Sequence, residues 1–199
     1  MKFGVTVFFL TFSLLCRAEE RREYDILVAG IKIGELSASK IIQDSVTSYS
    51  ITSEVNFWFL VRVRVNYSIT SRYKNGKLIS SFVETRSSKG NFKSSVVWED
   101  NHYNVKVDTY QYKKDTVLFS PIHFNVARLY FEEPDRVENM LADNFGQIAP
   151  STKLEANVYQ VTVTGNANRY YYKVGEMEKA IMHNPIKNFE IRRRSSDED

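Results

Sequence analysis

Residues Tyr49–Tyr73 read YSITSEVNFWFLVRVRVNYSITSRY, and this stretch decides the fold. Nearly all of its odd positions are apolar or aromatic, whereas most of its even positions are polar or charged. A period of two with β-branched and aromatic residues on one side is typical of strands that bury one face. In one straight strand the stretch would span about 80 Å, roughly twice the width of a domain of this size. The chain must therefore bend within it.

We place the bend at the apolar run Phe57–Leu60, where the alternation is interrupted. Either a corner of the sheet re-aims these side chains, or both faces of the sheet are covered there. An aromatic core at a corner is the simpler interpretation, and a rim that contacts a ligand is the alternative. The candidate ligand-lining residues in this stretch are Phe57, Trp58, Phe59, Val61 and Val63.

Downstream, the chain has the turn residues of antiparallel β structure. Asn75-Gly76 predicts a type I′ hairpin, because both central residues of that turn take positive φ. Further strands are expected over Asp25–Ala29, Lys32–Lys40, Lys77–Thr85, Phe92–Trp98, Tyr103–Val107, Tyr110–Tyr112, Val158–Thr164, Arg169–Val174, Met177–Ile181 and Asn188–Arg192. The fold class is therefore mainly β: an antiparallel meander that forms a curved sheet or a half-open barrel.

One segment departs from this pattern and predicts a short helix. Ser120-Pro121 reads as an N-cap followed by proline at the first helical position, and Pro134 forbids continuation. Between them apolar residues recur at helical spacing, at Ile122, Val126, Leu129 and Tyr130. A capping pattern at 135–138 leads into a second candidate helix, so we expect one or two short helices.

The N-terminus reads as a secretory signal peptide. Lys2 precedes an apolar run over 3–15, and a charge cluster begins at Glu19. Small residues lie at −3 and −1 if cleavage follows Ala18, so we expect cleavage there and export of the mature chain. The run is too short to span a bilayer, so no transmembrane span is expected in the mature chain. Lipid attachment at Cys16 is not expected, because the bulky Leu15 precedes it.

The expected organisation is a signal peptide over 1–18, a single β domain over 19–191 and a disordered charged tail over 192–199. The composition is that of a folded domain, since 43% of the residues are hydrophobic and 26% charged. The leader carries two basic residues and no acid, so the mature charge is +1, two less than the +3 of the whole chain. Nothing in this balance calls for a nucleic-acid partner. Removal of Cys16 leaves no cysteine for a disulfide or a metal site.

Residues with chemical potential form no established catalytic or metal-binding motif. His102, His123 and His183 lack zinc-ligand spacing, so no metal or other cofactor is expected. The adjacent Glu132 and Glu133 cannot readily share one site on a helix. Arg62 and Arg64 place two guanidinium groups on one face of a strand, which suits an anion. Solvated arginines opposite acidic cross-strand neighbours are the simpler interpretation.

Three passages carry a resemblance to a known family: YDILVAGIKIGE at 24–35, YKNGKL at 73–78 and PIHFNVARLYFEEP at 121–134. The chain resembles a family of small exported β-proteins of Gram-negative bacteria known as a domain of unknown function. The last passage is the most specific, through Pro121, Arg128, Glu133 and Pro134. The resemblance implies export and β architecture, and it transfers no active site. Residues 142–146 read ADNFG and depart from the family, which we associate with a stretch similar to Ser-Glu-x-Tyr-Gly at this place.

Two principal hypotheses for function follow. The first is a periplasmic binding or carrier module for a lipid, another apolar ligand or a lipid-modified partner, because a curved sheet with a helix across its concave face resembles lipoprotein-carrying half-barrels. Phe124 and Tyr130 would join the apolar lining from 57–63. The second is a structural or adaptor protein that contacts envelope partners. An enzyme is the weakest hypothesis, sketched as a hydrolase that uses His123 with Glu132 or Glu133.

Overall fold

The structure, a computed structural model, describes residues 18–59, 61–88, 90–109, 112–183 and 187–195. It contains one 14-stranded sheet and two short 3-10 helices, η1 (Val126–Tyr130) and η2 (Asp143–Phe145). The strands are β1 (Ala18–Val28), β2 (Ile31–Gln43), β3 (Val46–Phe59), β4 (Val61–Lys74), β5 (Lys77–Ser87), β6 (Gly90–Glu99), β7 (His102–Asp108), β8 (Lys113–Leu118), β9 (Asn139–Ala142), β10 (Gln147–Glu155), β11 (Val158–Val163), β12 (Asn166–Lys173), β13 (Glu176–Met182) and β14 (Phe189–Arg193).

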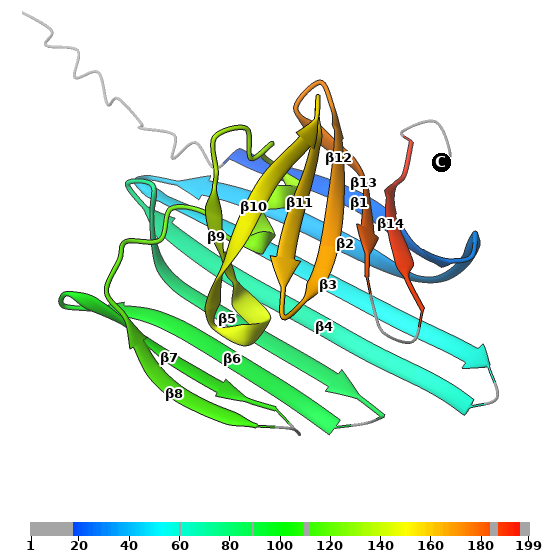
Figure 1. Cartoon of the computed structure of the whole chain (residues 1–199), viewed down its shortest axis with the longest axis horizontal. Helices are drawn as coiled ribbons and strands as arrows, with labels where there is room; N and C mark the ends of the chain where they lie inside the picture. The colour runs from blue at the N-terminus through cyan, green and yellow to red at the C-terminus, as the bar shows by residue number, and fades with distance from the viewer. Residues whose placement is uncertain (1–17, 60, 89, 110–111, 184–186, 196–199) are drawn as a thin grey trace, which may run out of the picture.

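The sheet is an antiparallel meander that does not close. Its order is β8-β7-β6-β5-β4-β3-β2-β1-β14-β13-β12-β11-β10-β9, so β1 pairs with β14 and the two edges are β8 and β9. In Figure 1 the strands β10–β13 cross in front of β2–β5, and η1 lies between these two layers. The predicted curved sheet or half-open barrel is confirmed.

The alternation in Tyr49–Tyr73 produces the expected buried face. Tyr49, Ile51, Ile69 and Tyr73 are each at most 3% exposed, and Ile51 lies opposite Ile69 in the β3–β4 register. The predicted bend falls between the end of β3 and the start of β4, which run antiparallel. The β4–β5 hairpin is also confirmed, because Asn75 and Gly76 have φ of 52° and 76°.

The connection between β8 and β9, residues 119–138, is called the inner segment below. We predicted a helix from Pro121 to Pro134, but only η1 is helical, and its N-cap is Asn125 rather than Ser120. The first part stays extended because it bonds to strands: Leu78 N donates to Ile122 O at 2.8 Å, and Leu141 N donates to Phe124 O at 2.9 Å. These bonds outweigh the helical spacing of the apolar residues.

Tyrosine hydroxyls of the sheet hold the backbone of the inner segment. Tyr24 donates to Tyr130 O at 3.2 Å, and Tyr172 donates to Leu129 O at 2.8 Å. The buried guanidinium of Arg22 also donates to Tyr130 O, at 2.8 Å. The carbonyls at the end of a helix have no partner within it, and these side chains satisfy them. The inner segment is thus a fixed part of the core.

Other expectations need correction. The second candidate helix is wrong, because Asn139–Ala142 forms strand β9 and pairs with β10. Strand β10 was not predicted. The strand expected at 110–112 lies partly outside the described residues, and β8 begins at Lys113. The ordered chain also extends beyond Ile191: β14 ends at Arg193, and Arg194 bonds Asp25 at 2.7 Å.

Candidate functional site

The most deeply buried polar cluster centres on Asp143, which is 2% exposed. Its carboxylate accepts hydrogen bonds from Ser81 Oγ at 2.6 Å, Asn125 Nδ2 at 2.8 Å and Val126 N at 3.2 Å. Asn125 Nδ2 also donates to Ser71 Oγ at 2.7 Å. The cluster thus joins the inner segment to β4 and β5. Among the described residues, no cation forms an ion pair with this carboxylate.

Burial raises the pKa of Asp143 from its ordinary value of 3.8 to about 6, although hydrogen bonds from Ser81, Asn125 and Val126 lower it. Desolvation penalises a buried charge, and only neutral donors offset the penalty here. A raised carboxyl pKa often marks an active site. This carboxyl, however, lies among packed side chains, and neither of two hollows on the outer face of the sheet includes it. Its contacts assign it to holding the inner segment.

A second cluster surrounds Arg128 in the inner segment. The guanidinium lies 4.7 Å from the ring centre of Phe124, 5.1 Å from that of Tyr73 and 5.9 Å from that of Tyr49. It also donates to the carboxylate of Glu132, which accepts a further hydrogen bond from Tyr49. Burial raises the pKa of Glu132, but these two donors and nearby cations hold it below its ordinary value.

The structure gives separate partners to the residues of the sketched hydrolase. His123 is exposed, and its Nδ1 lies 3.1 Å from Gly76 O. Glu132 is bound by Tyr49 and Arg128, whereas Glu133 accepts a hydrogen bond from Tyr159 at 2.8 Å. Neither carboxylate forms a hydrogen bond with His123. The geometry therefore gives the hydrolase hypothesis no support.

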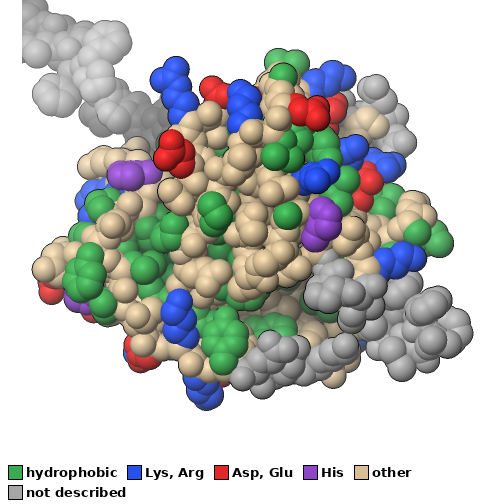
Figure 2. All heavy atoms as spheres, viewed as in Figure 1, with side chains coloured by type: hydrophobic (Ala, Val, Ile, Leu, Met, Phe, Trp, Pro, Cys, Tyr) green, Lys and Arg blue, Asp and Glu red, His purple; other side chains and the backbone are tan. Residues whose placement is uncertain are grey.

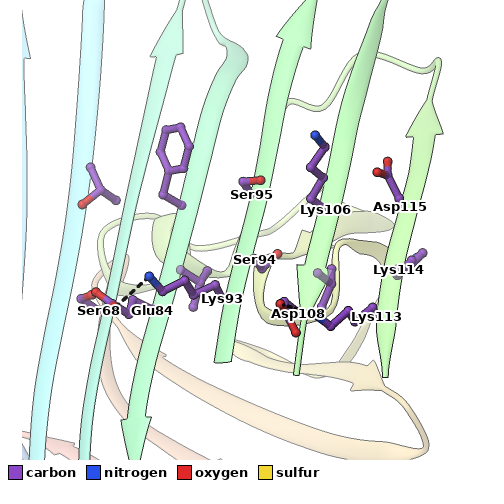
Figure 3. A pocket seen from close by; sticks show the side chains of 14 residues that line it. Ser68, Glu84, Lys93, Ser94, Ser95, Lys106, Asp108, Lys113, Lys114 and Asp115 are labelled. Carbon is purple, nitrogen blue, oxygen red and sulfur yellow. Dashed lines mark hydrogen bonds and ion pairs between the residues drawn. The ribbon is translucent and has the colours of Figure 1, made fainter. Parts of the chain in front are cut away.

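A hollow of about 720 Å³ lies on the outer face of β4–β8 (Figure 3). Lysines and acids alternate across its strands, in the register Glu84, Lys93, Asp108 and Lys113. Lys93 pairs with Glu84 at 3.5 Å, drawn as a dashed line in Figure 3, and Lys113 pairs with Asp108 at 3.0 Å. These charges are neighbours of opposite sign, so the hollow has little attraction for an ion of either sign.

One end of the half-barrel, called the open end below, carries apolar side chains that the core covers only in part. They come from β2, β3, β4, β13 and β14: Ile33, Val55, Val65, Tyr67, Met182 and Phe189. In Figure 1 the paired ends of β3 and β4 extend beyond the end of β14. On the face drawn in Figure 2, hydrophobic side chains appear at several places among polar and charged ones.

The predicted lining residues fall into two groups. Phe124 and Tyr130 are 7% and 6% exposed, and Tyr130 packs edge-on against Tyr24 with ring centres 5.4 Å apart. Phe57, Trp58, Phe59, Val61 and Val63 lie in β3 and β4, with Phe57 opposite Val63 and Phe59 opposite Val61, and their side chains lie outside the described residues. Their contact with a ligand stays a prediction.

The positions that carried the family resemblance lie at different depths. Pro121 is exposed, Pro134 is buried, and Arg128 and Glu133 are half-buried and bonded as described above. Sequence reasoning missed Asp143 and its partner serines. A signal was available, because Ser71 occupies an inward position of the alternation and Asp143 directly follows the apolar Met140–Ala142. A polar residue at such a position must find a partner if it is buried.

Two searches of the described residues gave negative results. No helix there has both the length and the apolar character needed to cross a membrane. No group of three or more His, Cys, Asp or Glu side chains in the same part of the chain is placed to hold a metal ion.

The fold and the filled interior define a β-barrel-like class of protein. Residues 24–194 match the family described as a domain of unknown function, DUF6134, and the chain belongs to that family. A similar solved structure is the β-barrel-like protein of the domain of unknown function DUF1849 from Brucella abortus, with a TM-score of 0.53 and 10% identity. The match covers 88% of this chain and 95% of that chain, and it shows a shared fold. No curated protein matches the sequence.

Proposed function

We propose that this protein is an exported, periplasmic binding module that holds an apolar ligand, such as the acyl chain of a lipid or of a lipid-modified partner, at its open end. The observation that carries the proposal is the apolar face of β3 and β4, which continues past the packed core. Ile51 and Ile69 are each 1% exposed, whereas Val55 and Val65, further along the same face, are half-buried.

In the β3–β4 register Phe57 lies opposite Val63 and Phe59 opposite Val61, and the alternation of the sequence predicts that they continue this apolar face. Apolar surface beyond a packed core costs free energy in water, and soluble proteins keep such patches small unless something binds them. The opposite end is occupied by the inner segment, whose backbone is bonded to Tyr24, Tyr172 and Arg22. Binding at the open end therefore requires no displacement of the inner segment.

The test is native mass spectrometry of the exported protein purified without detergent, combined with lipid extraction. A reproducible apolar molecule at about one per chain is expected. The variant Val55→Ser/Val65→Ser should lose it, because both side chains lie opposite each other at the open end. The matched control is Val97→Ser/Val117→Ser, which alters two valines of the outer face. A bare chain that also fails to bind added dodecyl maltoside would contradict the proposal.

The second candidate, a structural or adaptor protein of the cell envelope, is favoured by the filled interior. Phe124 and Tyr130, which we expected to line a ligand site, are packed in the core. In that case the open end contacts a protein, and cross-linking in cells through a photoreactive residue at position 55 should capture a discrete partner. Capture that persists in Val97→Ser/Val117→Ser and disappears with Val65→Ser would support this candidate.

A further inference from the structure

A second hollow, of about 380 Å³, lies on the outer face where β4, β5 and β6 approach the open end. It is called the arginine hollow below, and its lining is Arg64, Asn66, Arg86, Ser87, Ser88 and Asn91. Asn66, Arg86 and Asn91 lie side by side across the three strands. The lining contains two cations and no carboxylate, in contrast to the larger hollow, where the charges alternate.

The structure overturns the simpler interpretation of Arg64. We expected acidic cross-strand neighbours, but the residue opposite Arg64 on β3 is Asn56. On the other side, Ser88 N donates to Arg64 O at 3.3 Å, which places the end of β5 beside it. The nearest acid in the register is Glu54, opposite Asn66, and no ion pair joins Glu54 to Arg64 among the described residues.

Arg86 is only partly neutralised. Its guanidinium bonds Glu84 through Nε and Nη2, each at 3.2 Å, and Glu84 also lies 3.5 Å from Lys93. One carboxylate thus serves two cations beside the hollow, and Arg64 adds a third. With Glu54, opposite Asn66, included, three cations (Arg64, Arg86 and Lys93) face two carboxylates (Glu54 and Glu84), so the hollow has a net charge of one positive unit.

We infer that the arginine hollow binds a phosphate-type oxyanion. The Arg64 guanidinium offers planar pairs of N–H donors that match the oxygens of a phosphate. Arg86, whose Nε and Nη2 are bonded to Glu84, adds its remaining N–H donors, and the amides of Asn66 and Asn91 add neutral donors. An anion with several acceptor oxygens is the ligand that such a lining suits. Because both arginines are exposed, binding is weakened by salt.

The phosphate has two sources, free phosphate or the head group of an amphiphile. For the amphiphile, the inference rests on the proposed function, because the acyl chain would occupy the open end. Val65 of the open end lies between Arg64 and Asn66 of the hollow on β4, but its side chain points to the opposite face of the sheet. A single amphiphile would therefore have to pass round the paired ends of β3 and β4. For free phosphate, the inference stands without the proposed function.

The test uses the exported protein and three probes, sodium phosphate, dodecyl phosphate and the uncharged dodecyl maltoside, with binding measured by isothermal titration calorimetry at low ionic strength. Arg64→Gln and Arg86→Gln should each weaken phosphate or dodecyl phosphate binding about tenfold, the loss expected for one charge-assisted pair. The controls are matched. The control for Arg64→Gln is Arg72→Gln, because Arg72 is exposed on the same face of β4. The control for Arg86→Gln is Arg192→Gln, because Arg192 bonds Glu190 at 2.7 Å in the same i, i−2 arrangement as Arg86 with Glu84.

The outcomes separate the two sources. Binding of sodium phosphate that is lost in Arg64→Gln and kept in Arg72→Gln assigns a free-phosphate site. Binding of dodecyl phosphate alone, lost in both Arg64→Gln and Val55→Ser/Val65→Ser, assigns a head-group site. Dodecyl phosphate binding that depends on the valines and not on the arginines would overturn the inference and leave the proposed function standing. Absence of binding to the unmodified protein, or equal losses in Arg64→Gln and Arg72→Gln, would also overturn it.

Discussion

Asn125 donates a 2.8 Å hydrogen bond from its side-chain amide to the carboxylate of Asp143, and this contact fastens the inner segment to the sheet. The same amide donates to Ser71 Oγ on β4, and its oxygen accepts from Arg128 N as the N-cap of η1. One fully buried side chain thus ends the extended part of the inner segment, begins its helix and satisfies a buried charge.

Replacing Asn125 should therefore be costly. We expect Asn125→Ala to lower the free energy of unfolding by about 2 to 4 kcal/mol, because it removes a helix cap and a donor to a buried carboxylate. Urea denaturation followed by circular dichroism measures this. The matched control is Asn144→Ala, an exposed asparagine whose side chain accepts one bond from Tyr67 at 3.1 Å, with an expected loss below about 1 kcal/mol. Equal losses in the two variants would contradict this role for Asn125.

The Asp143 carboxyl should give the fold a distinct pH dependence. Its pKa is about 6 in the folded protein and 3.8 ordinarily, so the folded state binds more protons between these values. Its contribution therefore favours folding at low pH and is lost as pH rises through about 6. Between pH 4 and pH 7 the free energy of unfolding of the unmodified protein should fall by roughly 2 kcal/mol relative to that of Asp143→Asn. Urea denaturation of both proteins across this range measures the difference, and parallel pH profiles would show that Asp143 titrates normally.

Local rules predicted the parts of the fold that depend on neighbouring residues. The alternation in Tyr49–Tyr73 and the Asn75-Gly76 turn were sufficient, because side-chain direction in a strand and positive φ in a tight turn are set within a few residues. The inner segment is different. Its shape depends on bonds from Leu78, Tyr24 and Tyr172, which are distant in sequence. No periodicity within 119–138 reports these partners.

In the candidate sites, too, the features set by neighbouring residues could be predicted, and those set by residues distant in sequence could not. The sequence marked Arg64 as a cation on a solvent-facing strand position, and this was correct. Its neighbours depend on the β3–β4 register, which pairs it with Asn56 rather than with an acid. The buried role of Asp143 required the whole cluster of Ser71, Ser81 and Asn125, contributed by two strands and the inner segment.

Glu132 should show the opposite pH dependence to Asp143. Burial raises the pKa of Glu132, but the hydrogen bonds from Arg128 and Tyr49 and the nearby cations together lower it by more. The net shift of the pKa is therefore downward. A depressed carboxyl pKa contributes stability above the ordinary value of 4.5, and that stability is lost as pH falls through the folded-state pKa. Glu132→Gln should thus lower the free energy of unfolding by about 1 kcal/mol at pH 7, the upper end for a solvent-accessible ion pair, and by less at pH 3.5. Thermal unfolding at both values measures it. A larger cost at pH 3.5 would contradict the ion pair.

Gly146 allows η2 to pack tightly on β7. It has a φ of 53°, and a Cβ there would overlap Cγ1 of Val105 and lie 2.9 Å from Cγ2 of Val107. We expect Gly146→Ala to destabilise the fold by about 2 kcal/mol through overpacking and a left-handed backbone. The double variant Gly146→Ala/Val105→Ala should recover part of the packing loss in a double-mutant cycle. If the two losses are strictly additive, the clash with Val105 is not the cause.

Export should remove the leader without damage to the sheet. Cleavage after Ala18 leaves β1 from Glu19 onward. The strand loses only its terminal pair, in which Ala18 lies opposite Ile42, and the side chain of Ile42 is already 42% exposed. Arg22 and Tyr24, which bond the inner segment, remain. Intact-mass measurement of the periplasmic protein should give a chain that begins at Glu19. Ala18→Tyr should block processing, because the cleavage site requires a small residue, whereas Arg17→Lys should be processed normally. Periplasmic protein that retains residues 1–18 would show that the segment is not a cleaved signal peptide.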